Sequence, residues 1–335
     1  MTASSKELVR GLFSGKPVSR PPFIPYIATA AAQYMQVPVR QMFSDPTTLA
    51  NSLQSCQRLF KYDGIVLLFD NTLEAEACGC QLEWPEGQPP RVVSPVFKSE
   101  KELEALDASE IQNKGRIPLV LEAAKRLTQT AGSEVAMLGV VTGPITLSRH
   151  LMGEAFISAA DVNSQTFQNL VDLTGRIALA LARSFGELKL DGIILADREM
   201  ASLKPAGYTM LQPVLKTLRN LLNYYDAPLI IHTDEIPTEG LEPFFQLEAD
   251  GFSPENPISV ISSSSLPAGS LLGGGIPASV LLGSAAAIEK ATLDMLDSGV
   301  TSSLFITSQG EVPQATPASN IHQVMQVLTK APSNK

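Results

Sequence analysis

The chain has 335 residues, of which 44% are hydrophobic and 18% charged, and this composition is typical of a globular protein with one large core. Its net charge is −9 and no run of lysines and arginines occurs, which excludes nucleic acid and anionic membranes as expected partners, because both recruit clustered positive charge. We therefore expect the partner to be a small molecule or another protein.

Eight short apolar segments are predicted to be strands. Most of them end in a polar or turn-forming residue and are followed by a helical pattern, which is typical of parallel strands that are buried on both faces. The predicted strands cover residues 23–29, 64–70, 135–144, 192–197, 228–234, 251–256, 270–277 and 302–310.

Helices are predicted after these strands, so that strand and helix alternate eight times. This alternation favours a closed (β/α)8 barrel, or TIM barrel, over an open doubly wound sheet. Turn residues and short β-like pieces interrupt the pattern at residues 80–98, where we expect a β-hairpin insertion. No linker or repeat divides the chain, and residues 1–335 are predicted to form a single domain. The predicted helices cover residues 40–61, 115–131, 156–187, 205–225, 239–248, 258–265, 283–298 and 317–329.

The ends of the predicted strands carry the candidate functional residues, because active sites of such barrels lie at the C-terminal ends of the strands. In the segment "IIHTDE", His232 is followed two positions later by Asp234. The glycines of "LLGGGIP", which include Gly274, lack the Lys-Ser/Thr of a P-loop and are expected to allow close approach of a bulky ligand. The polar residues at the strand ends are Asp70, Thr142, Asp197, His232, Asp234, Glu255, Gln309 and Glu311.

Several of these residues also have a purely structural interpretation. Asp70 precedes Asn-Thr and could form an Asx-turn or a helix cap. Asp197 could belong to a surface ion pair with its neighbours Arg198 and Glu199. The pair Cys78 and Cys80 has no matching Cys/His pair and is predicted to pack in the interior. His150 and His322 are expected to be ordinary helix residues.

The location of the protein is predicted from its N-terminus and its cysteines. Residues 1–23 contain charges and prolines where a signal peptide needs an apolar stretch, and no 18-residue apolar run follows. Three cysteines, Cys56, Cys78 and Cys80, are too few for a disulfide framework and fit a reducing compartment. We therefore expect a cytoplasmic protein that is not associated with a membrane.

Six stretches, in the same order along the chain, resemble the family of uroporphyrinogen decarboxylase and the corrinoid-dependent methyltransferases related to it. The resemblance covers nearly the whole chain and implies a single (β/α)8 barrel. The six stretches are "KELVRGLFSGKPVSRPPFIPYI", "FDNTLEAEACGCQLEW", "GVVTGPITLSRHLMGE", "LKLDGIILADREMASLKP", "PLIIHTD" and "SQGEVPQATPASNI".

The decarboxylases of this family bind the carboxylates of their substrate through N-terminal arginines. The comparable segment here, "IATAAAQYM", contains no arginine. Gln309 occupies the position of the histidine in their C-terminal Gly-His-Gly turn, and Asp70 matches the aspartate that binds the pyrrole nitrogens. The resemblance therefore argues against decarboxylation.

The methyltransferase branch is the better match, through "TLEAEACGC" and the "TP..NI" ending. Its methylcobamide:coenzyme M members hold zinc with a His-x-Cys pair after the fifth strand and a cysteine after the eighth. Here His232 matches the histidine, Asp234 replaces the first cysteine and Glu311 the second. Zinc accepts histidine nitrogen and carboxylate oxygen, so the resemblance implies a zinc site of these three residues, although the loss of both cysteines leaves open a pocket without metal.

The resemblance implies transfer of a methyl group between a small ether, alcohol or thiol and the cobalt of a corrinoid. No "DxHxxG" cobalamin-binding signature occurs, so the corrinoid is expected on a separate partner protein. We assign catalytic roles to Asp70 and Asp197, and cofactor contacts to Thr142, Gly274 and Gln309. Two alternatives stay open: a tetrapyrrole enzyme of the decarboxylase type, and a non-catalytic barrel that binds a tetrapyrrole or corrinoid.

Overall fold

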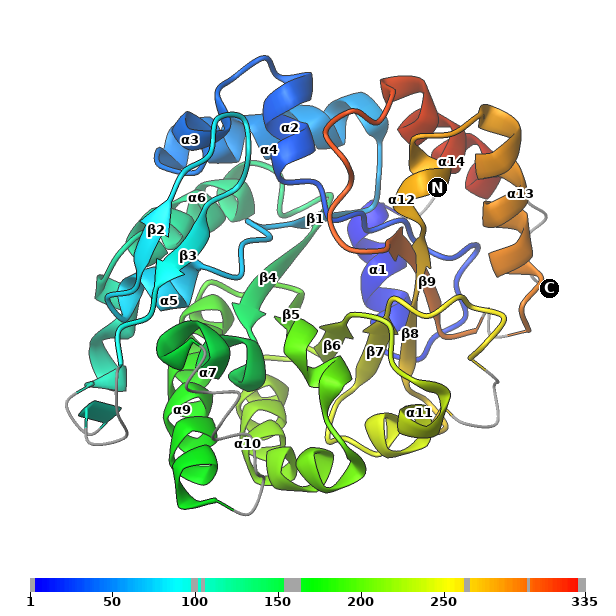
Figure 1. Cartoon of the computed structure of the whole chain (residues 1–335). Coiled ribbons are helices and arrows are strands. Elements are labelled where there is room, and N and C mark those ends of the chain that lie inside the picture. The colour runs from blue at the N-terminus through cyan, green and yellow to red at the C-terminus, as the bar shows by residue number, and fades with distance from the viewer. Residues whose placement is uncertain are drawn as a thin grey trace.

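Seven parallel strands form one curled sheet at the centre of the protein (Figure 1). The computed structural model describes residues 4–97, 102–103, 106–153, 164–261, 266–299 and 302–330. Nearly every strand residue is buried, as expected for strands that are covered on both faces. In sheet order the strands are β1 (Gly64–Val66), β4 (Ala136–Thr142), β5 (Gly192–Ala196), β6 (Leu229–Thr233), β7 (Gly251–Pro254), β8 (Leu271–Ile276) and β9 (Leu304–Ser308).

The ring between β9 and β1 is closed by the segment that was predicted as the first strand, residues 23–29. This segment is not a regular strand: only Phe23 forms a parallel bridge, with Ile306 of β9. On its other side the carbonyl of Phe23 accepts a hydrogen bond of 2.8 Å from the amide of Asp63, which precedes β1. Proline has no amide hydrogen to donate, and Pro25 ends the pairing. The predicted barrel is thus confirmed, and its eighth strand position is filled by a segment with a single bridge.

The helices surround the sheet and agree with most predicted ranges. The predicted helix 40–61 is two helices, because Asp45 caps a new helix that starts at Pro46. Residues 258–261 form turns instead of the predicted helix, and residues 156–163 and 262–265 lie outside the described part of the chain. The main helices are α1 (Ser5–Phe13), α2 (Thr29–Tyr34), α3 (Val39–Met42), α4 (Pro46–Phe60), α5 (Leu73–Ala77), α6 (Ile117–Thr130), α7 (Pro144–Met152), α9 (Gln165–Glu187), α10 (Pro205–Tyr224), α11 (Thr238–Phe245), α12 (Ala278–Leu281), α13 (Ala285–Leu296) and α14 (Ala318–Lys330), with 3-10 helices η2 (Ala108–Asn113) and η3 (Arg198–Ser202).

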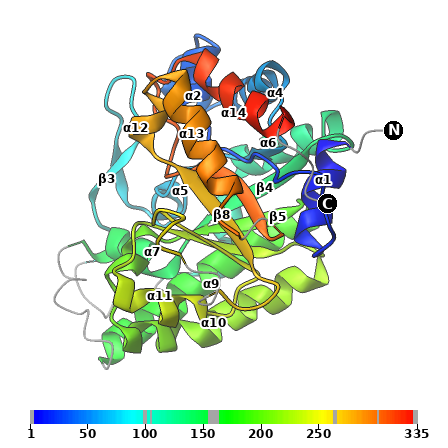
Figure 2. The same ribbon diagram turned by 90° about the vertical axis from the view of Figure 1, so that its right-hand side faces the viewer.

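The predicted hairpin insertion is confirmed as the antiparallel pair β2 (Gln81–Glu83) and β3 (Arg91–Ser94). Figure 2 shows this hairpin and helix α1 on opposite sides of the molecule. Helix α1 buries Leu8, Val9 and Leu12. The amide of Lys6 in α1 donates to the carbonyl of Glu134, just before β4, so α1 lies at the end of the barrel where the strands begin. Hairpin residues 89–92 lie beside residues that follow the strands, so the hairpin lies at the other end.

Three Asp-Gly pairs fix the end of the barrel where the strands begin. Each aspartate directly precedes a strand, and one of its oxygens accepts a hydrogen bond from a backbone amide of a neighbouring segment. Such charge-assisted bonds to buried amides are stronger than neutral ones. The three aspartates thus hold neighbouring segments in register at this end of the barrel. Asp63 binds the amide of Phe23 at 2.8 Å, Asp191 that of Met137 at 2.9 Å and Asp250 that of Leu229 at 2.9 Å.

The three cysteines are free thiols in the interior, as predicted for Cys78 and Cys80. Burial raises the pKa of Cys80 to about 11, which keeps this thiol protonated and unreactive at neutral pH. In the described part of the chain, no helix combines the length and the apolar character that crossing a membrane requires.

Candidate active site

A cavity of about 600 Å³ opens at the ends of the strands, a volume in the range of small-molecule sites. A larger hollow of about 750 Å³ lies beside α1 at the other end of the barrel, where active sites of such barrels do not occur. The cavity at the strand ends is lined by Phe69, Asp70, Asn71, Thr72, Pro89, Pro90, Arg91, Val92, Thr146, His150, Arg198, Glu199, His232, Asp234, Glu255, Gln309, Gly310 and Glu311.

His232, near the end of β6, is a deeply buried polar group at this cavity, with a side chain that is 2% exposed. Its Nδ1 lies 2.9 Å from the carbonyl oxygen of Ser253. A carbonyl can only accept, so Nδ1 carries the hydrogen and Nε2 carries a lone pair. Burial lowers the pKa of His232 to about 4. The imidazole is therefore neutral at physiological pH, and its Nε2 is an acceptor.

Two aromatic rings hold the imidazole in this orientation. Tyr26 and Phe69 stack on each other with centroids 4.8 Å apart. Both meet the ring of His232 edge-on, at 5.0 Å and 5.5 Å. The Tyr26 hydroxyl also lies 3.3 Å from the hydroxyl of Ser253. Because edge-to-face contacts and a backbone hydrogen bond act on the same ring, the direction of the His232 lone pair is fixed.

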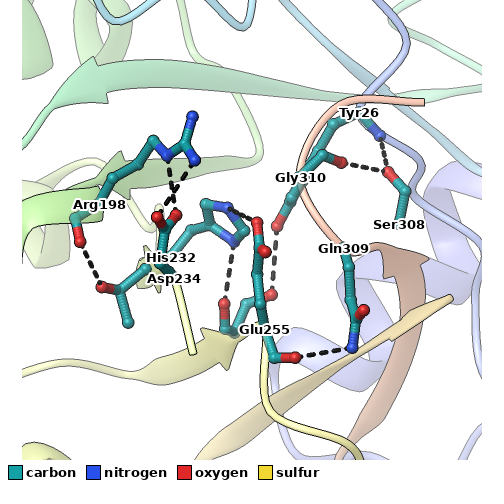
Figure 3. Close-up of polar contacts among 10 residues, drawn as sticks. Tyr26, Arg198, His232, Asp234, Glu255, Ser308, Gln309 and Gly310 are labelled. Atoms are coloured by element: carbon teal, nitrogen blue, oxygen red, sulfur yellow. Dashed lines mark hydrogen bonds and ion pairs between the residues drawn. The ribbon is translucent and has the colours of Figure 1, made fainter. Parts of the chain in front are cut away.

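Glu255 is the acid beside His232 (Figure 3), with Oε1 3.8 Å from Nε2. It follows β7 directly, and the side-chain amide of Gln309 donates a 2.7 Å hydrogen bond to its backbone carbonyl. Burial raises the pKa of Glu255, and nearby Asp234 raises it further. Glu255 was expected at a strand end, but the resemblance did not include it among the zinc ligands.

Asp234 is paired with a residue that the sequence did not suggest as its partner. Both of its carboxylate oxygens accept hydrogen bonds from Arg198, at 2.8 Å from Nε and 3.1 Å from Nη2 (Figure 3). This bidentate arrangement is the strongest geometry for an arginine and a carboxylate. Arg198 therefore neutralises Asp234, and it is not the partner of Asp197.

Glu311 follows β9 and reaches the cavity from the opposite side. Its carboxylate accepts hydrogen bonds from the amide and the hydroxyl of Thr29, at the start of α2. Burial raises the pKa of Glu311 to about 7. Both groups of Thr29 that bind this carboxylate are neutral.

The predicted zinc ligands His232, Asp234 and Glu311 all line the cavity, but their arrangement does not fit a zinc ion. Both oxygens of Asp234 are taken by Arg198, and Glu311 is bound by Thr29. Within the described ranges, no three His, Cys, Asp or Glu side chains are grouped so that they could hold a metal. A zinc ion at these residues would have to break the ion pair of Asp234 first.

Asp70 lines the cavity as predicted, but its oxygens are already engaged. One accepts from the amide and hydroxyl of Thr72 at 2.8 and 2.7 Å, which is the Asx-turn that the sequence allowed. The other accepts from Arg116 at 2.7 Å. Arg116 also binds Glu76 and lies over the ring of Trp84, 4.9 Å from its centroid. Asp70 therefore holds the wall of the cavity together.

Asp197 does not line the cavity, contrary to the expected catalytic role. It is fully buried and accepts hydrogen bonds from the amides of Ile145 and Thr146, at 3.0 and 2.8 Å, at the start of α7. The turn before α7 passes so close that a Cβ at Gly143 would lie 2.1 Å from the Cβ of Asp197. The carboxylate satisfies amides that a helix start leaves without partners, and its role is structural.

Two of the three expected cofactor contacts also lie elsewhere. Thr142 is 1% exposed, and its amide and hydroxyl donate to the carboxylate of Glu74 behind the cavity wall. A Cβ at Gly274 would meet Met295 of α13, so this position faces the helix layer. Alternate residues of a strand face opposite sides, and the apolar run could not show which glycine faces inward. Gln309 does line the cavity.

The sequence missed several residues of this cavity. His150 of α7 lines it, although the sequence indicated an ordinary helix residue. The tip of the hairpin, residues 89–92, covers the rim. Asn71 contributes a buried side-chain oxygen that has no hydrogen-bond partner. Only the neighbouring Asp70 could have pointed to Asn71; the other positions depend on packing between segments that are distant in the sequence.

A prediction follows for Glu74, because burial raises its pKa to about 7 from an ordinary value of 4.5. Between these two values the folded protein keeps a proton that the unfolded chain has lost, so stability falls as pH rises. The unfolding free energy of the wild type, minus that of Glu74→Gln, should fall by about 2 kcal/mol from about pH 5.5 to about pH 8. Urea unfolding of both proteins at the two pH values measures this difference. A constant difference would show that Glu74 is ionised throughout.

Comparison with known proteins agrees with this architecture. Over 332 residues the chain is 24% identical to the methylcobamide:CoM methyltransferase MtbA of Methanosarcina acetivorans, covering 96% of both chains. It is 29% identical over 180 residues to the uroporphyrinogen decarboxylase of Prochlorococcus marinus, covering 50% of this chain and 49% of the other. A solved methyltransferase from Methanosarcina mazei superposes with a TM-score of 0.87 at 19% identity, covering 98% and 99% of the two chains. The profile of the uroporphyrinogen decarboxylase family matches residues 4–331, and the chain therefore belongs to that family.

Proposed function

We propose that this protein is a corrinoid-dependent methyltransferase, which moves a methyl group between a small substrate and the cobalt of a separate corrinoid protein. The observation that carries the proposal is the cavity at the barrel mouth, in which the Nε2 of His232 faces Glu255 at 3.8 Å. Two relatives named as methylcobamide:CoM methyltransferase MtbA match over 96% of this chain, whereas the decarboxylase of Prochlorococcus marinus matches over 50% of it. Buried free thiols fit a reducing compartment, so we propose that it acts in the cytoplasm.

Decarboxylation of a tetrapyrrole is the weaker alternative because no free positive charge lines the cavity among the described residues. Its two lining arginines are Arg91 and Arg198. Arg91 pairs with Glu83 at 2.6 Å, and Arg198 pairs with Asp234. A substrate with several carboxylates would find both of these cations already neutralised, next to the carboxylates of Glu255 and Glu311.

The cavity has room for the small substrate and not for the corrinoid. About 600 Å³ accommodates a small molecule, whereas a corrinoid is several times larger than such a ligand. We therefore place the corrinoid at the opening, beside the hairpin tip at residues 89–92, where its cobalt supplies or accepts the methyl group. The small substrate lies inside, where the Nε2 of His232 orients its heteroatom and Glu255 faces the same atom.

The experiment that tests this function compares two reactions with one protein preparation. Reduced cobalamin is mixed with the protein and a panel of methylated amines, ethers and thioethers, and the visible spectrum reports methylation of cobalt. Uroporphyrinogen is supplied in parallel, and its carboxylate content is followed by chromatography. We expect methylation of cobalt and no decarboxylation. Decarboxylation alone would establish the tetrapyrrole enzyme, and tight corrinoid binding with neither reaction would establish the non-catalytic barrel.

A further inference from the structure

The charges around the cavity do not cancel. Both arginines that line it are paired with carboxylates, and Arg116 and Arg149 bind the lining carboxylates of Asp70 and Glu199. Among the described lining residues, two carboxylates have no such partner, Glu255 and Glu311. In the described part of the chain, neither of them lies within ion-pair distance of a lysine or an arginine. A Cβ at Gly310 would lie 2.9 Å from Oε1 of Glu255, so Glu255 borders the turn that carries Glu311. The pairs are Arg91 with Glu83, Arg116 with Asp70 and Glu76, Arg149 with Glu199, and Arg198 with Asp234.

Two further groups at the cavity accept hydrogen bonds and have no donor. The Nε2 of His232, whose side chain is 2% exposed, has no hydrogen-bond donor among the described residues, and the Oε1 of Glu255 lies 3.8 Å from it. That distance is too long for a hydrogen bond. The side-chain oxygen of Asn71 is buried without any partner. Buried acceptors without donors are rare in folded proteins, because an unmet polar group costs about 1–3 kcal/mol. The cavity therefore offers acceptors and negative charge to whatever enters it.

We propose that the methyl-carrying substrate is a methylated ammonium ion with at least one N–H group. This proposal rests on the proposed function and names the substrate class of the same site. An ammonium ion supplies the positive charge that Glu255 and Glu311 lack, and one of its N–H groups supplies the donor that the Nε2 of His232 lacks.

The reaction of such a substrate balances without an added acid. The cobalt of the reduced corrinoid attacks the methyl carbon with its electron pair. The carbon–nitrogen bond breaks, and nitrogen leaves with that bond's electrons as a neutral amine. The substrate loses its positive charge in this step, so Glu255 and Glu311 bind the substrate more tightly than the product. This difference favours release of the amine.

Three other ligand classes fit the cavity less well. An anion would face two unpaired carboxylates, which repel it. A neutral ether or thioether has no N–H group for the Nε2 of His232. A divalent metal would satisfy the charge, but the carboxylates and the imidazole are not grouped as a ligand set among the described residues.

The test uses two probes with the same chain of heavy atoms, N-methylpropylammonium and methyl propyl ether. Their affinities are measured by calorimetry at pH 8, together with those of a methylthioalkane sulfonate and of zinc. We expect the ammonium ion to bind at least about tenfold more tightly than the ether, and the sulfonate not to bind, because a charged hydrogen bond contributes about 1.5–3 kcal/mol. Equal affinity of ammonium and ether, or tighter binding of the sulfonate, would overturn the proposal. So would one equivalent of zinc that displaces the ammonium ion.

Variants locate the effect within the cavity. Glu255→Gln and Glu311→Gln should each weaken ammonium binding about tenfold and leave ether binding unchanged. Glu122→Gln on α6, an exposed residue paired with Arg126, is the matched control and should bind like the wild type. If both cavity variants bind ammonium normally while circular dichroism shows that they are folded, the carboxylates are not the binding groups. If a variant fails to fold, the ratio of ammonium to ether affinity in the wild type still shows whether the cavity selects an ammonium ion.

The same probes separate this proposal from the proposed function. Selective binding of ammonium without methylation of cobalt would refute the methyltransferase and retain the ligand class. Methylation of cobalt by the ether and not by the ammonium ion would retain the methyltransferase and refute the ligand class.

Discussion

Replacing His232 by alanine should lower the rate of methyl transfer by at least about 100-fold and leave the protein folded. A side chain that orients or exchanges a proton with the reacting atom typically contributes 10²–10⁴-fold to the rate. The ring is held by Ser253, Tyr26 and Phe69, so its lone pair is directed before the substrate arrives. The measurement is the change of the cobalamin spectrum with time, at saturating methyl donor.

The matched control is His322→Ala on α14, where the ring contacts Phe60 and lies away from the cavity. This variant should keep the wild-type rate. Because removal of a buried side chain also costs stability, both variants are compared by circular dichroism and thermal unfolding. A folded His232→Ala protein that reacts at the wild-type rate would remove His232 from the chemistry.

Replacing Arg116 by methionine should destabilise the protein by about 3–5 kcal/mol, because it leaves a buried carboxylate without its cation. The side chains of Arg116 and Asp70 are 8% and 2% exposed, and 2.7 Å separates their charged atoms. The arginine also lies over Trp84, which adds a cation–π contact. Urea unfolding measures the loss of free energy.

A second variant identifies the cause of this loss. Arg116→Met combined with Asp70→Asn removes the unpaired charge and should recover at least half of the lost stability. If the double variant is as unstable as the single one, lost packing against Trp84 explains the effect instead. Recovery would confirm that Asp70 serves the architecture of the cavity wall.

Much of the barrel could be predicted because parallel strands covered on both faces leave a clear pattern of apolar runs. β4, β5, β6 and β9 lie within the predicted ranges. The segment around Phe23 shows the limit of this pattern. Its apolar residues predict a strand, but the prolines beside it have no amide hydrogens for a ladder, so one bridge remains.

The site could be predicted only in part, because a strand end shows where a side chain begins and not which way it faces. Asp70 and Asp197 both close a predicted strand in the sequence, yet Asp70 lines the cavity and Asp197 binds the start of α7. The pairing of Arg198 with Asp234 joins residues 36 positions apart. Their contact follows from the pairing of β5 with β6 and not from any motif.

The fate of the methyl group itself distinguishes a methyltransferase from the two alternative functions. Methylcobalamin that carries a ¹³C-labelled methyl group is incubated with the protein and a panel of amine and thiol acceptors, and NMR locates the label. We predict that the label leaves cobalt for nitrogen or sulfur of a small acceptor, at a rate that depends on the wild-type protein and is lost in His232→Ala. A label that stays on cobalt with every acceptor, and a reduced cobalamin that takes no methyl group from any donor, would contradict the account.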